Sequence, residues 1–88
     1  MKKIYKVVVR YGYMTENGIR YNTDWEFFAT KKAYQQWIDF MEESRAFVNY
    51  ETASAKVYEM KADYTGHFVE NYKEIDNFNF TTNKKMFV

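Results

Sequence analysis

The segment YGYMTENGIRYNT, residues 11–23, constrains the fold more than any other part of the chain. It holds two runs in which large apolar and polar residues alternate, a pattern typical of β-strands. The dipeptide Asn17-Gly18 between them is a strong hairpin signal. Since the side-chain period of a strand is two, shifting the pairing by one residue moves every side chain to the other face of the sheet. The length of the loop therefore decides which aromatic residues are buried.

Two loop lengths are compatible with the hairpin signal. A two-residue loop, 17–18, places apolar Val9 opposite charged Glu26 and mixes both kinds of residue on each face. A three-residue loop, 16–18, places Val9 opposite Trp25 and gathers the apolar residues of both strands on one face. Because register normally follows the apolar pattern, we expect the three-residue loop with its glycine in a G1 bulge.

The expected register gives the hairpin two different faces. The odd-numbered residues of both strands form an apolar face. The even-numbered face is expected to carry Val8 and Phe28 among charged residues, namely Lys6, Arg10, Arg20, Asp24 and Glu26.

A helix is predicted from Lys31 to about Phe47, with Thr30 as its N-cap. Its apolar residues recur at spacings of three and four and form a stripe that contains Trp37 and Ile38. We expect this stripe to pack on the apolar face of the hairpin.

The second half of the chain predicts a second hairpin. A third strand is expected over Thr52–Asp63. Its apolar residues change face near Val57, which predicts either a bulge there or a strand covered on both faces. A turn at 64–66 and a fourth strand over His67–Ile75 follow.

The predicted fold is α+β, a small antiparallel sheet of about four strands in ββαββ order with one helix packed across one face. Residues 1–76 are expected to form a single domain, since 88 residues leave no room for a second core. Residues 77–88 are interpreted as a C-terminal tail that docks on the domain or binds a partner. The order in which the two hairpins join remains open.

Composition and missing motifs exclude several functions. The chain has no cysteine and a single histidine, His67, so we expect no cofactor, no metal site and no enzymatic activity. No segment reaches the roughly 20 apolar residues of a membrane span, and the apolar run 7–9 is too short for an export signal, so we expect a cytoplasmic protein. Thirteen basic and twelve acidic residues give a net charge of +1, which does not indicate a general nucleic-acid binder.

The aromatic content favours a protein-binding module. Nine Tyr, eight Phe and two Trp compete for few interior positions in so short a chain, and surplus exposed rings tend to mark interfaces. The partner is expected to be a protein of unknown identity, or a second copy that covers a sheet edge. The candidate contact residues are Val8, Phe28, Tyr50, Tyr58, Tyr64, Phe68, Tyr72, Phe78 and Phe80.

The alternative is binding of single-stranded nucleic acid. Basic residues interleaved with aromatic rings on an open sheet face are typical of single-strand platforms. The candidate residues are Lys6, Arg10, Arg20 and Phe28. Asp24 and Glu26 are expected on that same face, where they would largely cancel its positive charge.

In composition alone, a small, cysteine-free chain rich in Tyr and Lys with an Asn-rich end resembles accessory proteins of phages and mobile elements of low-GC bacteria. The resemblance implies stoichiometric inhibition of a host factor as one form of the protein-binding hypothesis.

Overall fold

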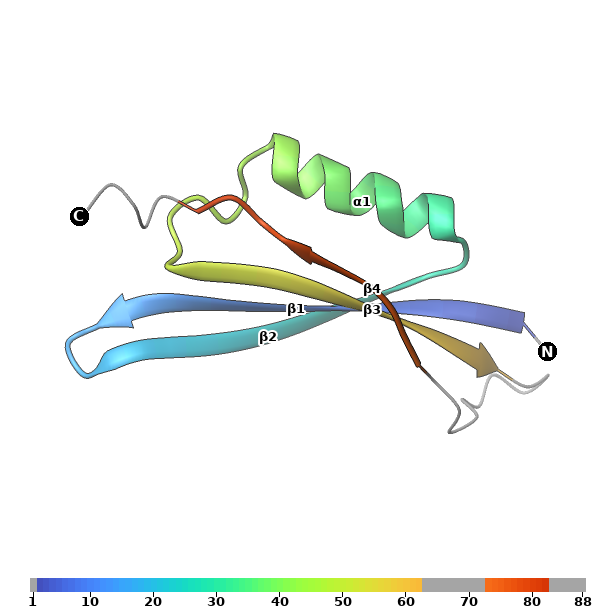
Figure 1. Ribbon diagram of the computed structural model, residues 1–88, viewed down its shortest axis with the longest axis horizontal. Helices are drawn as coiled ribbons and strands as arrows, with labels where there is room; N and C mark the ends of the chain where they lie inside the picture. Colours follow the sequence, from blue (N-terminus) through green and yellow to red (C-terminus); the bar gives the residue numbers. More distant parts are fainter. Residues whose placement is uncertain (1, 63–72, 83–88) are drawn as a thin grey trace.

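The computed structural model describes residues 2–62 and 73–82 (Figure 1). In this part of the chain the elements follow in the order β1 (Lys2–Thr15), β2 (Gly18–Phe28), α1 (Lys31–Glu43), β3 (Thr52–Ala62) and β4 (Lys73–Asn79). The four strands form one antiparallel sheet in the spatial order β2-β1-β3-β4. The predicted small antiparallel sheet with one helix is confirmed, and the two hairpins join through β1 and β3.

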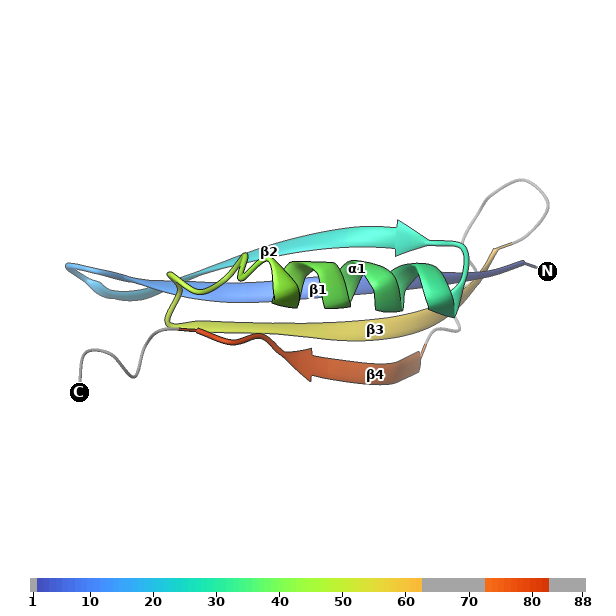
Figure 2. The ribbon, with the colours of Figure 1, turned by 90° about the horizontal axis from the view of Figure 1, so that it is seen from above.

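The helix covers one face of the sheet. Seen from above, α1 lies along β1 and β3, with β2 and β4 at the two outer edges (Figure 2). Tyr34 and Ile38 of the helix are buried against Val7 and Val9 of β1 and Val57 of β3. We call this side the helix face. No described element covers the opposite side, which we call the open face (Figure 1).

The register of β1 and β2 differs from the predicted one. Val9 lies opposite Asp24 and Thr15 lies opposite Gly18, so the connecting loop is Glu16-Asn17. The Thr15 hydroxyl donates to the carbonyl oxygen of Gly18 at 2.6 Å and accepts from the backbone N–H of Asn17 at 3.2 Å. Gly18 has a φ of 109°, which favours glycine, but it is the first residue of β2 and not part of a bulge. The prediction of a three-residue loop was wrong.

This register reverses the face of the sheet on which each β2 side chain lies. Since β2 is an edge strand, its apolar residues are not forced toward the core, and the turn sets the pairing. The even-numbered residues of β2 lie on the helix face together with Val7 and Val9, and its odd-numbered residues lie on the open face. Each side chain of β2 is therefore on the face opposite to the one expected.

The helix begins as predicted and ends earlier. The Thr30 hydroxyl accepts from the backbone N–H of Ala33 at 3.0 Å, which confirms the N-cap. At the other end, Arg45 adopts a φ of 56°, and the N–H of Ala46 bonds to the carbonyl of Met41 at 3.1 Å. This is the hydrogen bond of a Schellman motif, which ends a helix. The helix therefore stops at Glu43, and the chain turns back toward the sheet.

The chain beyond residue 76 belongs to the domain. Strand β4 continues to Asn79, and Phe80 is 6% exposed, with its ring centroid 4.7 Å from that of Phe47. The backbone N–H of Phe80 bonds to the carbonyl of Ala53 at 2.9 Å, and Thr81 bonds to the carboxylate of Glu42. Residues 77–82 thus pack on the sheet and core, as in the docked alternative for the segment after residue 76.

The two edges of the sheet are different. Strand β2 pairs with β1 over its full eleven residues without a register shift. Strand β4 has seven residues and a shift opposite Val57 and Tyr58, where Ile75 is the extra residue. The bulge expected in the third strand near Val57 is absent: β3 pairs with β1 without a shift, and the extra residue belongs to β4. The fourth strand was expected over His67–Ile75. Residues 73–75 of that range belong to β4, and residues 67–72 lie outside the described residues.

Candidate binding surface on the open face

The open face exposes a row of large apolar side chains. Five of the six exposed large hydrophobic residues among the described residues lie on it. They are Met14 (60% exposed), Ile19 (42%), Tyr21 (46%), Trp25 (57%) and Phe27 (45%). The sixth, Phe40, lies on α1. Exposed apolar residues scattered singly need no explanation, but a row along one strand indicates a contact surface.

Two cations of β1 lie over these rings. The guanidinium carbon of Arg10 is 4.2 Å from the ring centroid of Tyr21. The ammonium nitrogen of Lys6 is 5.4 Å from the Trp25 ring and 5.9 Å from the Phe27 ring. These distances are within the range of cation–π attraction. The arrangement follows from the register. Lys6 is opposite Phe27, and Trp25, which is opposite Val8, is the diagonal neighbour of Lys6 on the same face.

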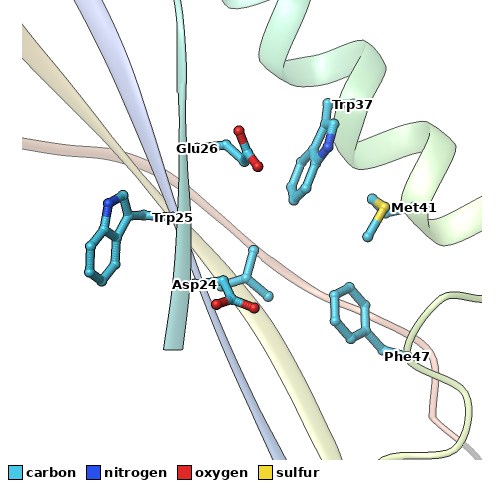
Figure 3. A pocket seen from close by; sticks show the side chains of 7 residues that line it. Asp24, Trp25, Glu26, Trp37, Met41 and Phe47 are labelled. Carbon is cyan, nitrogen blue, oxygen red and sulfur yellow. The ribbon is translucent and has the colours of Figure 1, made fainter. Parts of the chain in front are cut away.

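The carboxylates of β2 lie away from these cations. Asp24 and Glu26 are on the helix face, and Figure 3 shows Trp25 on the other side of the β2 ribbon from Glu26. Lys56 of β3 is on the open face and is 3.6 Å from the carboxylate of Glu74 at the far edge. The open face beside β2 is therefore basic and aromatic, and the acidic residues expected to neutralise it are on the opposite side of the sheet.

Gly12 makes room for the apolar end of this surface. It lies on the open face opposite Tyr21. A Cβ atom at this position would be 2.9 Å from Cγ2 of Ile19, 3.0 Å from Cε1 of Tyr21 and 3.1 Å from Oγ1 of Thr52. The absence of a side chain at Gly12 lets Ile19 and Tyr21 approach the backbone of β1 closely.

A groove of about 380 Å³ lies on the helix face, between β2 and α1 (Figure 3). Asp24 and Glu26 line it on the strand side, and Trp37, Met41 and Phe47 line it on the other. Glu26 points toward Trp37 in this view. The groove combines acidic and aromatic side chains, whereas the open face combines basic and aromatic ones.

One carboxylate of the groove is held by a tyrosine. The hydroxyl of Tyr11 donates to Oδ2 of Asp24 at 2.9 Å. This hydrogen bond raises the pKa of Tyr11 above its ordinary value, because the bond is lost when the phenol ionises beside a carboxylate. The pKa of Tyr34 is also raised, mainly because the phenol is buried.

The predicted protein-binding residues do not form one surface. Val8 and Tyr58 lie half-buried on the open face, next to the exposed rings. The others that the structure describes pack inward: Phe28 against Trp37, Tyr50 against Tyr11, and Phe78 and Phe80 around Phe47. Phe80 is buried and is a core residue. Tyr64, Phe68 and Tyr72 lie outside the described residues.

The predicted nucleic-acid-binding residues divide between the two faces. Lys6 and Arg10 lie on the open face, as expected. Arg20 is opposite Tyr13, and Phe28 packs on Trp37, so both lie on the helix face. Their placement on the open face was wrong because the register differs by one residue, which reverses the side of every β2 residue.

Tyr21, Trp25 and Phe27 were missed as surface residues. They were expected under the helix because they share the odd-numbered positions of β2 with no charged residue. The signal that identifies them is the position of β2 at the edge of the sheet. A strand at the edge of a sheet can leave its apolar side exposed, and the hairpin sequence alone does not show which strand is at the edge.

Within the described residues, α1 is too short and too polar to cross a membrane, and no three potential metal-ligating side chains lie together. His67 lies outside the described part of the chain. Comparison with models of known protein families, with curated proteins and with solved structures finds no match for this chain.

Proposed function

We propose that the protein is a non-enzymatic module that binds single-stranded nucleic acid on the open face. The observation that carries this proposal is the separation of charges across β2. Lys6 and Arg10 lie over exposed rings, while Asp24 and Glu26 are on the opposite face. The main argument against nucleic-acid binding was that these carboxylates would neutralise the basic surface, and they do not share it.

The rings supply the stacking surface of this site. Trp25, Phe27 and Tyr21 are each about half exposed and alternate along one strand. Bases stack on such rings in single-strand binding proteins, and each stacked base contributes about 1–3 kcal/mol by alanine substitution. Stacking depends little on sequence because every base has a flat face, so the expected ligand is a single strand without strong sequence preference.

The cations supply the phosphate contacts. Lys6 and Arg10 lie beside the rings. Lys56 lies on β3, on the far side of β1 from the rings, and the carboxylate of Glu74 partly compensates its charge. With two or three phosphates contacted, the logarithm of the affinity should fall against the logarithm of salt concentration with a slope of about −1.4 to −2.1. Binding is therefore expected to be moderate and to depend on stacking as much as on charge.

Fluorescence anisotropy with labelled oligodeoxythymidylate and oligouridylate of roughly 15 nucleotides tests the proposal. Trp25→Ala should weaken binding about tenfold, since about 1.4 kcal/mol corresponds to a factor of ten. Phe40→Ala is the matched control, because Phe40 is equally exposed but lies on the helix. Absence of binding at about 50 mM salt, or equal effects of the two substitutions, would reject the proposal.

Binding of a protein partner on the open face is the second candidate function. The hypothesis of a stoichiometric inhibitor is one form of it. Met14 and Ile19 favour it, because they form an exposed apolar end of the open face at the β1–β2 turn. Met and aromatic residues are enriched at protein interfaces. In affinity capture from a lysate with and without nuclease, a stoichiometric protein that survives nuclease and is lost with Met14→Ser would support this candidate.

A further inference from the structure

The free edge of β2 is unusually open to pairing. The strand has eleven residues, and Gly18 to Phe27 are all exposed. It pairs with β1 on one side without a bulge, and no described strand pairs with the other side. Proteins usually protect such edges with Pro, Lys, bulges or short strands. The sequence GIRYNTDWEFF contains no Pro, Lys or bulge, and its charged residues, Arg20, Asp24 and Glu26, all lie on the helix face, which leaves the open-face side of this edge uncharged.

We propose that β2 of a second copy of this chain pairs with β2, antiparallel, about a two-fold axis at Thr23. An interface of this kind uses the same surface twice, so the strand must be complementary to itself. Thr23 is the midpoint of the range Gly18–Phe28. With the axis at this residue, Gly18 lies opposite Phe28 of the second copy, and every residue of the strand has a partner.

Charge complementarity selects this register. On the helix face, the axis at Thr23 sets Arg20 of each copy opposite Glu26 of the other, which makes two opposite-charge pairs. Neither residue forms an ion pair within residues 2–62 and 73–82 of its own chain. A two-fold arrangement keeps each face of the sheet on its own side, so odd residues meet odd residues. In any two-fold register, the helix faces of the two copies therefore lie on one side of the joined sheet and the open faces on the other.

The other two-fold registers nearby are less favourable. An axis at Asp24 would set this carboxylate opposite its own copy, where like charges repel. An axis at Asn22 would leave Phe27 and Phe28 without opposing residues and shorten the pairing to residues 18–26. The axis at Thr23 combines the longest pairing with opposite charges.

The open face supports the same register. With the axis at Thr23, Tyr21 lies opposite Trp25 of the second copy, and Ile19 lies opposite Phe27. Aromatic and apolar cross-strand pairs of this kind stabilise sheets. The two open faces become one continuous surface, and the two helices lie on the same side of an eight-stranded sheet. This inference rests on the edge of β2 and stands whether or not the open face binds nucleic acid.

Charge exchange at Arg20 and Glu26 tests the register. Sedimentation equilibrium should show a dimer for the wild type, and Arg20→Glu and Glu26→Arg should each weaken dimerisation about tenfold, because each substitution sets like charges opposite each other twice. The double variant Arg20→Glu/Glu26→Arg restores opposite charges and should restore the dimer. Lys32→Glu and Glu43→Arg are matched controls, since they make the same changes of net charge on exposed helix positions.

A single cysteine tests the axis. The chain contains no cysteine, so Thr23→Cys introduces one thiol per copy. Opposed Cα atoms in antiparallel strands are about 4.5–5.5 Å apart, which is within the range of a disulfide. Mild oxidation should therefore join Thr23→Cys into a covalent dimer and leave Gln36→Cys, on the exposed side of α1, largely monomeric.

Two results would overturn the proposal. One is a monomeric wild type at every concentration. The other is a dimer that survives both single charge reversals and is not cross-linked through position 23. Circular dichroism of each variant would establish that it is folded, so that loss of the dimer is not confused with loss of the domain.

Discussion

The side chain of Phe80 packs residues 77–82 against the core, and its truncation should destabilise the whole domain. The side chain is 6% exposed and contacts the rings of Phe47 and Phe78, at centroid distances of 4.7 and 5.2 Å. Phe80→Ala would leave a cavity where β3, β4 and the segment after α1 meet. Residues 77–88 were interpreted as a tail that docks on the domain or binds a partner, and this substitution tests whether residues 77–82 contribute to the stability of the domain.

The expected cost follows from the buried area. A phenylalanine buries at least about 150 Å² of largely apolar surface, which corresponds to about 4 kcal/mol at 25 cal/mol per Å². Measured Phe→Ala substitutions in cores cost about 3–5 kcal/mol, in agreement with this value. In a domain of this size, each kcal/mol lowers the melting temperature by about 4–8 °C. We expect Phe80→Ala to lower it by at least about 12 °C.

Urea and thermal unfolding followed by circular dichroism would measure this effect. Phe40→Ala is the control, because it removes the same ring from a position that is 64% exposed and should cost less than about 1 kcal/mol. If both variants unfold at the same urea concentration, Phe80 does not belong to the core and the assignment of residues 77–82 to the domain is wrong.

Three further predictions concern the hairpin and the helix. Thr30→Ala removes the acceptor for the N–H of the third helical residue and should cost about 1 kcal/mol in urea unfolding, whereas Thr30→Ser should be nearly neutral. Gly18→Ala should cost about 1–3 kcal/mol through its φ of 109° alone, since no atom lies within 4 Å of the added Cβ; unchanged stability would contradict this conformation. The raised pKa of Tyr11 means that its hydrogen bond to Asp24 stabilises the fold fully below about pH 10 and is lost as pH rises through the raised pKa. The free energy of unfolding should thus fall more steeply above pH 10 in the wild type than in Asp24→Asn, and equal slopes would refute the assignment.

Local signals in the sequence predicted the elements well. The alternation of apolar residues indicated both strands of the first hairpin, and Thr30 marked the start of the helix. The end of the helix was placed about four residues too late, because Phe47 continues the apolar spacing. Phe47 is indeed buried, but the chain reaches that position through the left-handed turn at Arg45. The spacing of apolar residues indicates which positions are buried, but it does not show whether the chain is still helical at those positions.

The register of the hairpin could not be predicted from its own residues. The apolar residues of β2 were expected to face the core, as they would in a central strand. Pairing between β1 and β3 places β2 at the edge, and this long-range contact is not visible in the hairpin sequence. The open-face position of Lys6 and Arg10 was predicted correctly because it depends only on β1, whose opposite face packs under the helix. Trp25 and Phe27 were not, because they depend on the strand order.

The irregular strand β4 limits how far the sheet can extend. Sheets with two long and regular edges can add copy after copy, and unlimited addition produces fibres. Here the second edge is seven residues long, is interrupted at Ile75 and consists mainly of polar residues. If β2 edges are joined, the assembly has only these short outer edges left, and growth stops at two chains. In such a dimer, the bulge in β4 would oppose the addition of further copies.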